Sequence, residues 1–166
     1  ELKNFCKQLA RNIKYSIITE LNYHFDYLKQ SPEKVAKDFL MEQNLYKNPL
    51  NVNEGTVRIG LKIFGEQYIL VAMYSMLIKG NTHLQVETKT GLGGTKICFD
   101  ALTNNQIDMY PEYTGTGLLV ILQATDTAVA RLGSDKEKAY EYVQQEFLKK
   151  YNLEWLNPIG LNNTYT

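Results

Sequence analysis

A cluster of glycines provides the first candidate for chemistry, at Gly91-Leu92-Gly93-Gly94-Thr95. A glycine-rich turn between a strand and a helix can aim backbone N–H groups and a helix N-terminus at an anion. The spacing matches neither a Walker A loop, since no Gly-Lys-Ser/Thr follows it, nor the G-x-G-x-x-G motif of dinucleotide-binding proteins. Because glycine supplies positive φ wherever a turn requires it, a purely structural turn explains the cluster equally well.

Residues that could carry catalysis or hold a metal are sparse. The two histidines, His24 and His83, have no cysteine, histidine or carboxylate at ligand spacing beside them. Asp108 and Glu112 could form a carboxylate pair, although a solvated turn carboxylate or a helix cap is the commoner role. No nucleophile elbow is present. We therefore predict no catalytic residue, no metal site and no cofactor.

Tyrosine is unusually frequent, with 12 copies against 6 phenylalanines and 1 tryptophan. Tyr110 and Tyr113 follow a predicted strand, at the edge where open parallel sheets bind ligands. Tyr165 lies in a second polar segment, residues 162–165. Stacked aromatic rings hold quaternary ammonium groups, which have no N–H to donate. For any single tyrosine, packing in the core or on the surface is the commoner role.

Composition narrows the class of protein. The chain has 166 residues, which suits one compact domain, and 44% of them are hydrophobic. Lysine plus arginine and aspartate plus glutamate number 18 each. This balance gives no electrostatic signal for nucleic acid or for anionic lipid. No apolar run is long enough to span a bilayer, and the first residues lack the apolar core of a signal peptide. A processed or excised piece of a longer protein is therefore expected. Cys6 and Cys98 are expected to be small buried hydrophobes.

The elements that position these residues alternate between strands and helices after an all-helical start. Residues 1–30 are expected to be helical, with a stripe at Phe5, Leu9, Ile13, Ile17 and Leu21. Ser31 and Pro32 begin a second helix, with Val35, Ala36, Phe39 and Leu40 on its apolar face. A connector without periodicity follows at 49–55.

Strands are expected at 56–61, 83–88 and 107–110. Helices are expected at 67–79, ending at Gly80, and at 114–124. Two further helices are expected to begin at a Thr95 cap and at a capping box formed by Ser134 and Glu137. This order predicts an α/β fold with a mostly parallel central sheet flanked by helices.

Four motifs then carry a resemblance to a known family. They are R-I-G-L-K-I-F-G-E-Q at 58–67, K-T-G-L-G-G-T at 89–95, D-M-Y-P-E-Y-T-G-T-G at 108–117 and L-N-P-I-G-L-N-N-T-Y at 156–165. Together they resemble the first lobe of the glycine betaine/carnitine/choline-binding proteins of ABC importers. The resemblance implies a single lobe of a type II periplasmic-binding-protein fold, without enzymatic activity.

The same resemblance implies a set of ligand-binding residues. The matches to Gln67 and Thr116 hold the ligand carboxylate in the family, and the matches to Tyr113 and Tyr165 form part of an aromatic cage. Six further residues are expected beside the ligand: Phe64, Gly93, Gly94, Thr95, Tyr110 and Asn163. The sequence departs from the family at Gly65, where threonine is usual, and at Ile63, often asparagine or aspartate. Space beside Gln67 could admit a larger betaine such as ergothioneine.

Residues 1–48 resemble the family's extreme C-terminus, through E-L-N-Y at 20–23 and S-P-E-K-V-A-K-D-F-L at 31–40. The chain would thus be a permuted first lobe, with tail helices at 1–48, a connector at 49–55 and the lobe's own sequence at 56–166. An engineered single lobe and the junction of tandem binding domains both fit, and we favour the engineered lobe.

The resemblance implies a binding role with defined partners. These are a small quaternary-ammonium solute, an ABC permease subunit or fused permease domain, and a second lobe that completes the cleft, in an extracytoplasmic location. A regulatory ligand-sensing lobe is one alternative. A small α/β enzyme that uses the Gly91–Thr95 turn as an anion site is the other, although only Thr95 and Cys98 could serve it as nucleophiles.

Overall fold

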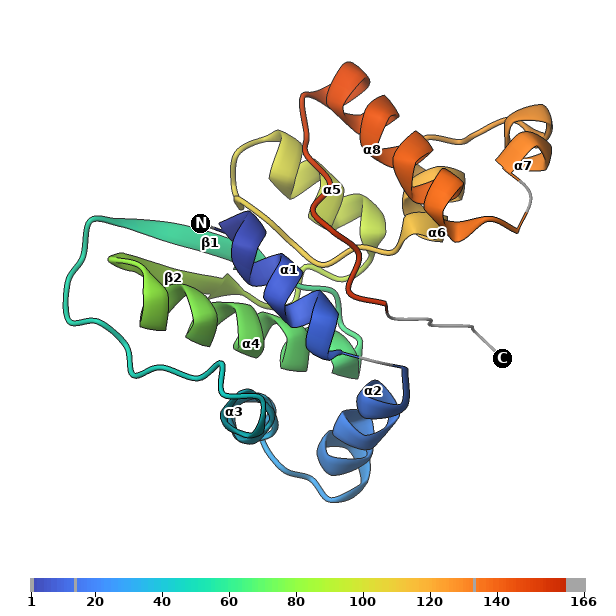
Figure 1. Cartoon of the computed structure of the whole chain (residues 1–166). Coiled ribbons are helices and arrows are strands. Elements are labelled where there is room, and N and C mark those ends of the chain that lie inside the picture. Colours follow the sequence, from blue (N-terminus) through green and yellow to red (C-terminus); the bar gives the residue numbers. More distant parts are fainter. Residues whose placement is uncertain (1, 14, 133, 161–166) are drawn as a thin grey trace. The chain divides into compact units, whose positions relative to one another are not determined.

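The structure is a computed structural model that describes residues 2–13, 15–132 and 134–160. No helix among these residues is both long and apolar enough to cross a membrane. The elements, in chain order, are α1 (Leu2–Asn12), α2 (Tyr15–Asn22), the π-helix η1 (Tyr23–Tyr27), α3 (Pro32–Glu42), β1 (Gly55–Gly60), α4 (Gly65–Asn81), β2 (Leu84–Lys89), α5 (Thr95–Thr103), α6 (Thr114–Thr116), the π-helix η2 (Gly117–Ile121), α7 (Asp126–Leu132) and α8 (Lys136–Tyr151) (Figure 1).

The chain forms two compact units. The first unit contains Glu1–Pro111 and Asn157–Thr166, and the second contains Glu112–Leu156. In the first unit β1 and β2 pair in parallel, from Gly55 opposite Leu84 to Gly60 opposite Lys89. Helix α4 makes the crossover between them. The predicted α/β class with parallel strands flanked by helices is therefore confirmed.

Helix α4 forms the centre of the first unit and lies between the strands and α3 in Figure 1. A helix that is apolar on all sides is buried in a core, and ten of its 17 residues are buried. The predicted end at Gly80 is wrong, because the helix continues to Asn81. A Cβ on Gly80 would lie 2.7 Å from the carbonyl oxygen of Lys47, so this glycine allows close backbone packing and does not end the helix.

Most of residues 1–30 are helical as predicted, but the structure divides them into α1, α2 and η1. Leu9, Ile13 and Leu21 of the predicted stripe are buried. Ile17 is only half-buried, and its neighbour Ile18 is buried instead. The side chains of Phe5 and Cys6 lie outside the described set, whereas Cys98 is buried as predicted.

The start of α3 confirms the sequence prediction. Ser31 has extended backbone angles, its hydroxyl accepts a hydrogen bond from the Lys34 N–H at 3.2 Å, and Pro32 follows as the first helical residue. The predicted apolar face, which packs in the core, is buried at Val35, Ala36, Phe39 and Leu40.

The connector at 49–55 is fixed to the rest of the first unit by hydrogen bonds. The Leu50 N–H donates to the Lys79 carbonyl at 2.9 Å, and the Glu54 N–H donates to the His83 carbonyl at 2.8 Å. Between them, Nε2 of Gln85 donates to the carbonyl of Val52 at 3.1 Å. The N-terminal helices, the connector and the segment from β1 to β2 are therefore parts of the first unit.

Three further local predictions are corrected. Gly94, not Thr95, is the N-cap of α5, and Thr95 is its first helical residue. Asp135, not Ser134, caps α8, because its carboxylate accepts from the Lys138 N–H at 3.1 Å. The predicted strand at 107–110 is reduced to a single parallel bridge between Met109 and Ile59.

In the second unit, helices pack around the only tryptophan of the sequence, Trp155. Its ring makes an edge contact with Phe147 at 5.1 Å between centroids. A Cβ on Gly117 would lie 2.6 Å from Cζ2 of Trp155, so only glycine fits there. The predicted helix at 114–124 is present as α6 followed by η2, and α7 is a helix that the sequence pattern did not indicate.

Candidate functional site

Three chain segments end side by side at one edge of the first unit. Gly60 ends β1 and pairs with Lys89, which ends β2. On the other side of β1, the Gly60 N–H donates to the carbonyl of Met109 at 2.9 Å. The loops that leave these three ends begin at Leu61, Thr90 and Tyr110. Such an edge, at the carboxyl ends of parallel strands, is where open α/β sheets bind ligands.

Backbone hydrogen bonds hold two of these loops together. The Leu61 N–H donates to the Lys89 carbonyl, and the Ile63 N–H donates to the Gly93 carbonyl, both at 3.3 Å. Gly60 permits this packing, because a Cβ there would lie 2.5 Å from Ile107 and 3.0 Å from Leu92. Leu92 of the glycine-rich turn therefore packs under the end of β1.

Gln67 is the most unusual residue at this edge. It lies in the first turn of α4, where its N–H donates to the carbonyl of Phe64 at 3.0 Å. The residue is only 1% exposed, yet neither Nε2 nor Oε1 has a hydrogen-bond partner among the described residues. Phe64 is the N-cap of α4 and provides no side-chain cap. A buried amide without partners costs about 1–3 kcal/mol, so the Gln67 side chain is a polar group that the described residues leave unsatisfied.

The glycine-rich turn is explained mainly by its backbone. Gly91 and Gly93 have φ of 72° and 77°, the left-handed region that glycine adopts most easily. Gly94 is extended and caps α5 without any side-chain hydrogen bond. The backbone angles are those of a tight turn that requires glycine, which is the structural explanation of the cluster. An anion site at the N-terminus of α5 stays a prediction.

The remaining predicted residues fall outside this edge or outside the described residues. The structure brings Phe64, Gln67, the Gly93–Thr95 turn and the strand-like segment before Tyr110 together in the first unit. Tyr113 and Thr116 belong to the second unit and are half-buried there. Asn163 and Tyr165 lie outside the described residues.

Within the second unit, Tyr113 is the N-cap of α6. Its N–H donates to Oε1 of Glu112 at 2.8 Å, and its carbonyl accepts from the Gly117 N–H at 2.8 Å. Thr116 is the last residue of α6 and lies three residues after the N-cap Tyr113. The T-G-T-G motif forms the short helix α6 and its continuation into η2.

An ion pair that sequence reasoning missed fixes the third segment to β1. Nη2 and Nε of Arg58 donate to the two carboxylate oxygens of Asp108 at 2.7 and 3.0 Å, and the Arg58 N–H donates to the same carboxylate at 2.7 Å. The side-chain hydrogen bonds from Arg58 lower the pKa of Asp108 and raise the pKa of Arg58. The Asp108 carboxylate is therefore held by Arg58 and has a structural role.

A second missed residue is Lys62, which is only 1% exposed and makes an interaction within the structure. A buried lysine is costly unless it is paired. Its signal in the sequence is weak, because Lys62 stands between Leu61 and Ile63 like any outward-facing residue of a strand. No group of three or more histidine, cysteine, aspartate or glutamate residues in the described part of the chain could hold a metal ion.

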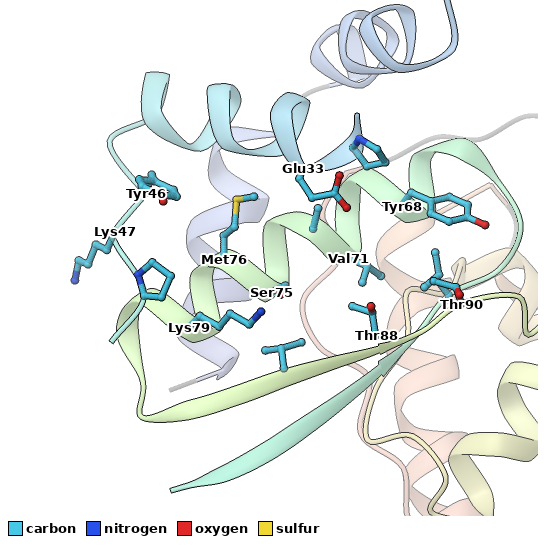
Figure 2. A pocket seen from close by; sticks show the side chains of 15 residues that line it. Glu33, Tyr46, Lys47, Tyr68, Val71, Ser75, Met76, Lys79, Thr88 and Thr90 are labelled. Carbon is cyan, nitrogen blue, oxygen red and sulfur yellow. The ribbon is translucent and has the colours of Figure 1, made fainter. Parts of the chain in front are cut away.

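A groove of about 380 Å³ lies between α3, α4 and β2 in the first unit, and its lining includes Leu61 and Thr90, at which two loops of this edge begin. Figure 2 shows Tyr46 and Lys47 at one end of the groove and Tyr68 and Thr90 at the other. None of the predicted site residues that the structure describes lines it. The groove therefore reaches this edge at Leu61 and Thr90, although Gln67 itself does not line it.

Comparisons with known proteins agree with the motifs at this edge. Residues 55–166 match the family described as the substrate binding domain of ABC-type glycine betaine transport systems. The fold of that family is the type II periplasmic-binding fold, as the sequence predicted.

Individual relatives give the same picture. The chain is 30% identical over 129 residues to the ergothioneine transport permease/ergothioneine binding protein EgtU of Helicobacter pylori, a match that covers 76% of this chain and 22% of the relative. It is 30% identical over 110 residues to the glycine betaine-binding protein YehZ of Escherichia coli, covering 66% and 34%. It is 32% identical over 114 residues to the carnitine transport binding protein OpuCC of Listeria monocytogenes, covering 68% and 35%. The chain thus spans about a fifth to a third of the length of these relatives.

Proposed function

Because the chain belongs to the family of substrate binding domains of ABC-type glycine betaine transport systems, we propose that it carries the first-lobe half of a site for a quaternary-ammonium solute. The ligand class includes glycine betaine, carnitine, choline and ergothioneine. The relatives named above are described as binding or transporting three of these compounds. The proposed role is solute capture for import, without catalysis.

The buried and unpartnered side chain of Gln67 is the observation that carries this proposal. Its amide Nε2 can donate to a ligand carboxylate, which would satisfy the group that the described residues leave without a partner. The first N–H groups of α4 lie in the same turn and favour a negative charge through the helix dipole. Thr116 is the second proposed carboxylate ligand, through its hydroxyl group.

The trimethylammonium end of the ligand needs aromatic rings instead of hydrogen-bond acceptors. Tyr113 and Tyr165 are the proposed rings of this lobe. Phe64, Gly93, Gly94, Thr95, Tyr110 and Asn163 are proposed to border the ligand. The other rings would come from a second lobe that closes on the ligand by a hinge.

A lobe that acts alone leaves its cation–π contacts open to water. Each such contact is then worth roughly 0.5–1 kcal/mol. Since about 1.4 kcal/mol is a factor of ten in affinity, we expect the 166-residue chain to bind betaines at least ~100-fold more weakly than a two-lobed relative.

The domain organisation is part of the proposal. Residues 1–48 would be the family's C-terminal helices, 49–55 a connector and 56–166 the first lobe. The packing of α3 on α4 and the hydrogen bonds of Leu50 and Glu54 support one unit built from both segments. An ABC permease, as a subunit or a fused domain, is the proposed protein partner, in an extracytoplasmic setting.

A ligand titration by NMR tests the proposal. Glycine betaine, carnitine, choline and ergothioneine are added separately to ¹⁵N-labelled protein, and shifts of the Gln67 side-chain amide are followed. We expect saturable shifts of this amide with the carboxylate-bearing ligands, weakened in Tyr113→Ala. In Gln67→Ala, which lacks the side-chain amide, the shifts of the neighbouring backbone amides should weaken. Absence of any shift at Gln67 up to about 100 mM ligand, far beyond the weak binding expected of millimolar sites, would overturn the proposed function.

A further inference from the structure

An exposed pair of tyrosine rings lies on η1 (Tyr23–Tyr27). Tyr23 and Tyr27 stack with 5.1 Å between ring centroids and 16° between ring planes. They are 51% and 73% exposed, so their outer faces are open to solvent. His24 adds an edge contact to Tyr23 at 6.2 Å between centroids. Large aromatic rings exposed side by side usually mark an interaction site.

A carboxylate flanks this pair. Asp26 directly precedes Tyr27, is exposed, and has no ion pair or hydrogen bond among the described residues. Its Oδ1 atom would lie 3.0 Å from a Cβ on Gly65, and the residue next to it in the chain is Tyr27. An acidic group beside electron-rich ring faces is complementary to a cation.

The tyrosine pair is fixed on the core of the first unit by Phe25. The rings of Phe25 and Tyr68 stack at 6.3 Å between centroids. Phe25 also lies over Gly65, where an added Cβ would be 3.0 Å from its Cε1 atom. Phe25 therefore holds η1 against the first turn of α4, so Tyr23 and Tyr27 need not be ordered when a ligand binds.

Another tyrosine of the same unit, Tyr46, already contacts a cation of the chain, unlike Tyr23 and Tyr27. The ammonium of Lys37 lies 5.0 Å from the ring centroid of Tyr46, so that ring already has a cation from the chain. Tyr23 and Tyr27 have no such cation among the described residues.

We propose that Tyr23, Tyr27 and Asp26 form a surface site for a small quaternary-ammonium cation that needs no carboxylate on the ligand. The rings attract the methylated ammonium through their faces, and Asp26 supplies the opposite charge. This site uses none of the residues of the proposed carboxylate and cage site, so it is tested independently of the proposed function. Its exposure predicts weak binding, with a dissociation constant on the order of 10 mM.

Choline and its neutral isostere 3,3-dimethylbutanol are the probes for the test. Each is titrated into the 166-residue protein, and the ring signals of Tyr23 and Tyr27 are followed by aromatic NMR. We expect choline to shift these signals and the isostere to leave them unchanged. Equal shifts with both probes would mean a merely apolar patch, and no shift with choline would mean no site. Either result overturns the proposal.

Variants identify the groups responsible. Tyr27→Leu and Asp26→Asn are each expected to weaken choline binding about two- to fivefold, as the loss of one exposed contact predicts. Tyr46→Leu, which removes the ring that already holds Lys37, is the matched control and should leave the shifts of Tyr23 intact. Asp26→Asn changes an exposed charge and keeps the rings, so loss of folding does not explain its effect. An affinity unchanged in both Tyr27→Leu and Asp26→Asn overturns the proposal.

Different NMR signals report ligand binding at the proposed carboxylate site and at the tyrosine surface site. The Gln67 side-chain amide reports the proposed function, and the Tyr23 and Tyr27 rings report the surface site. Choline shifts confined to the Gln67 amide would overturn the surface site and leave the proposed function standing.

Discussion

Gly65 lies directly against Phe25, with space for no side chain between them. A Cβ on Gly65 would lie 3.0 Å from Cε1 and 3.2 Å from Cδ1 of the ring, and 3.0 Å from Oδ1 of Asp26. The resemblance to the binding-protein family predicts threonine at this position. The contact gives a physical reason for the glycine, because a larger residue would require Phe25 and Asp26 of η1 to shift away from the first turn of α4.

Gly65→Thr is therefore expected to destabilise the first unit. Overpacking of a close contact costs about 1–3 kcal/mol, and we expect a loss of that size in the free energy of unfolding, measured by urea denaturation. Phe25→Ala provides the control in a double-mutant cycle. In that background the ring is absent, so the cost of Gly65→Thr should shrink. An equal cost with and without Phe25 would show that this contact is not responsible.

The two glycines of the T-G-T-G motif are expected to respond oppositely to alanine. A Cβ on Gly117 would lie 2.6 Å from Cζ2 and 2.9 Å from Cη2 of Trp155, whereas a Cβ on Gly115 would meet nothing within 4 Å. Gly117→Ala should cost about 1–3 kcal/mol through overpacking. Gly115→Ala should be neutral or gain up to about 1 kcal/mol from the lower entropy of the unfolded chain.

Fluorescence of Trp155, the only tryptophan, provides the measurement during urea unfolding. Gly117→Ala should also shift the native emission spectrum, and Gly115→Ala should not. Similar destabilisation by both substitutions would mean that a ligand or backbone requirement, and not the packing of Trp155, selects the glycines.

Local patterns predicted the first unit well where one element buries one apolar face. Ser31 and Pro32 determine the start of α3 through their backbone geometry and a hydrogen bond to the N–H three residues later. Both are local, so the sequence alone predicts where this helix begins. The strands β1 and β2 lie where the β-branched and alternating sequence predicted them, although burial does not alternate along either one. The N-terminal helices were harder to predict, because the stripe at spacing four continues across the boundary between α1 and α2.

Long-range contacts explain what sequence reasoning missed at the site. Gly60 and Gly65 owe their identity to Leu92, Ile107 and Phe25, which are distant in the sequence. The pairing of Arg58 with Asp108 spans 50 residues. The role of Gln67 came from resemblance, and its burial without partners is a property that no local pattern could reveal.

The Arg58–Asp108 pair predicts a dependence of stability on acid. Hydrogen bonds from Arg58 lower the pKa of Asp108 below its ordinary value of 3.8. A carboxyl group with a lowered pKa in the folded state stabilises the protein above its unfolded pKa, and this contribution is lost as the pH falls through the folded pKa. Asp108→Asn should therefore unfold more easily at neutral pH and lose less stability between about pH 5 and pH 2.

Urea unfolding of Asp108→Asn and of the original protein across this range measures the difference. Arg58→Gln is the companion variant, since it removes the donor and leaves the carboxylate. It should flatten the same acid limb. If both variants follow the pH profile of the original protein, the pair contributes nothing to stability in solution.

Gln67→Leu is expected to raise stability and to abolish the carboxylate contact. Leucine has a similar volume and no polar atoms, so it removes two buried groups that have no partner among the described residues. Since an unsatisfied buried group costs about 1–3 kcal/mol, urea unfolding should show a gain of that order. The same variant should lose the response of the neighbouring backbone amides to glycine betaine, because Nε2 is absent.

Gln144→Leu is the matched control. Nε2 of Gln144 donates to the carbonyl of Trp155 and to the hydroxyl of Tyr140, both at 2.9 Å. Its replacement breaks satisfied hydrogen bonds, so the second unit should lose about 1–2 kcal/mol, opposite in sign to Gln67→Leu. A loss of stability in both variants would show that the Gln67 amide has partners in the unliganded protein. A gain at Gln67 and a loss at Gln144 would identify Gln67 as a residue whose polar group serves binding at the expense of folding stability.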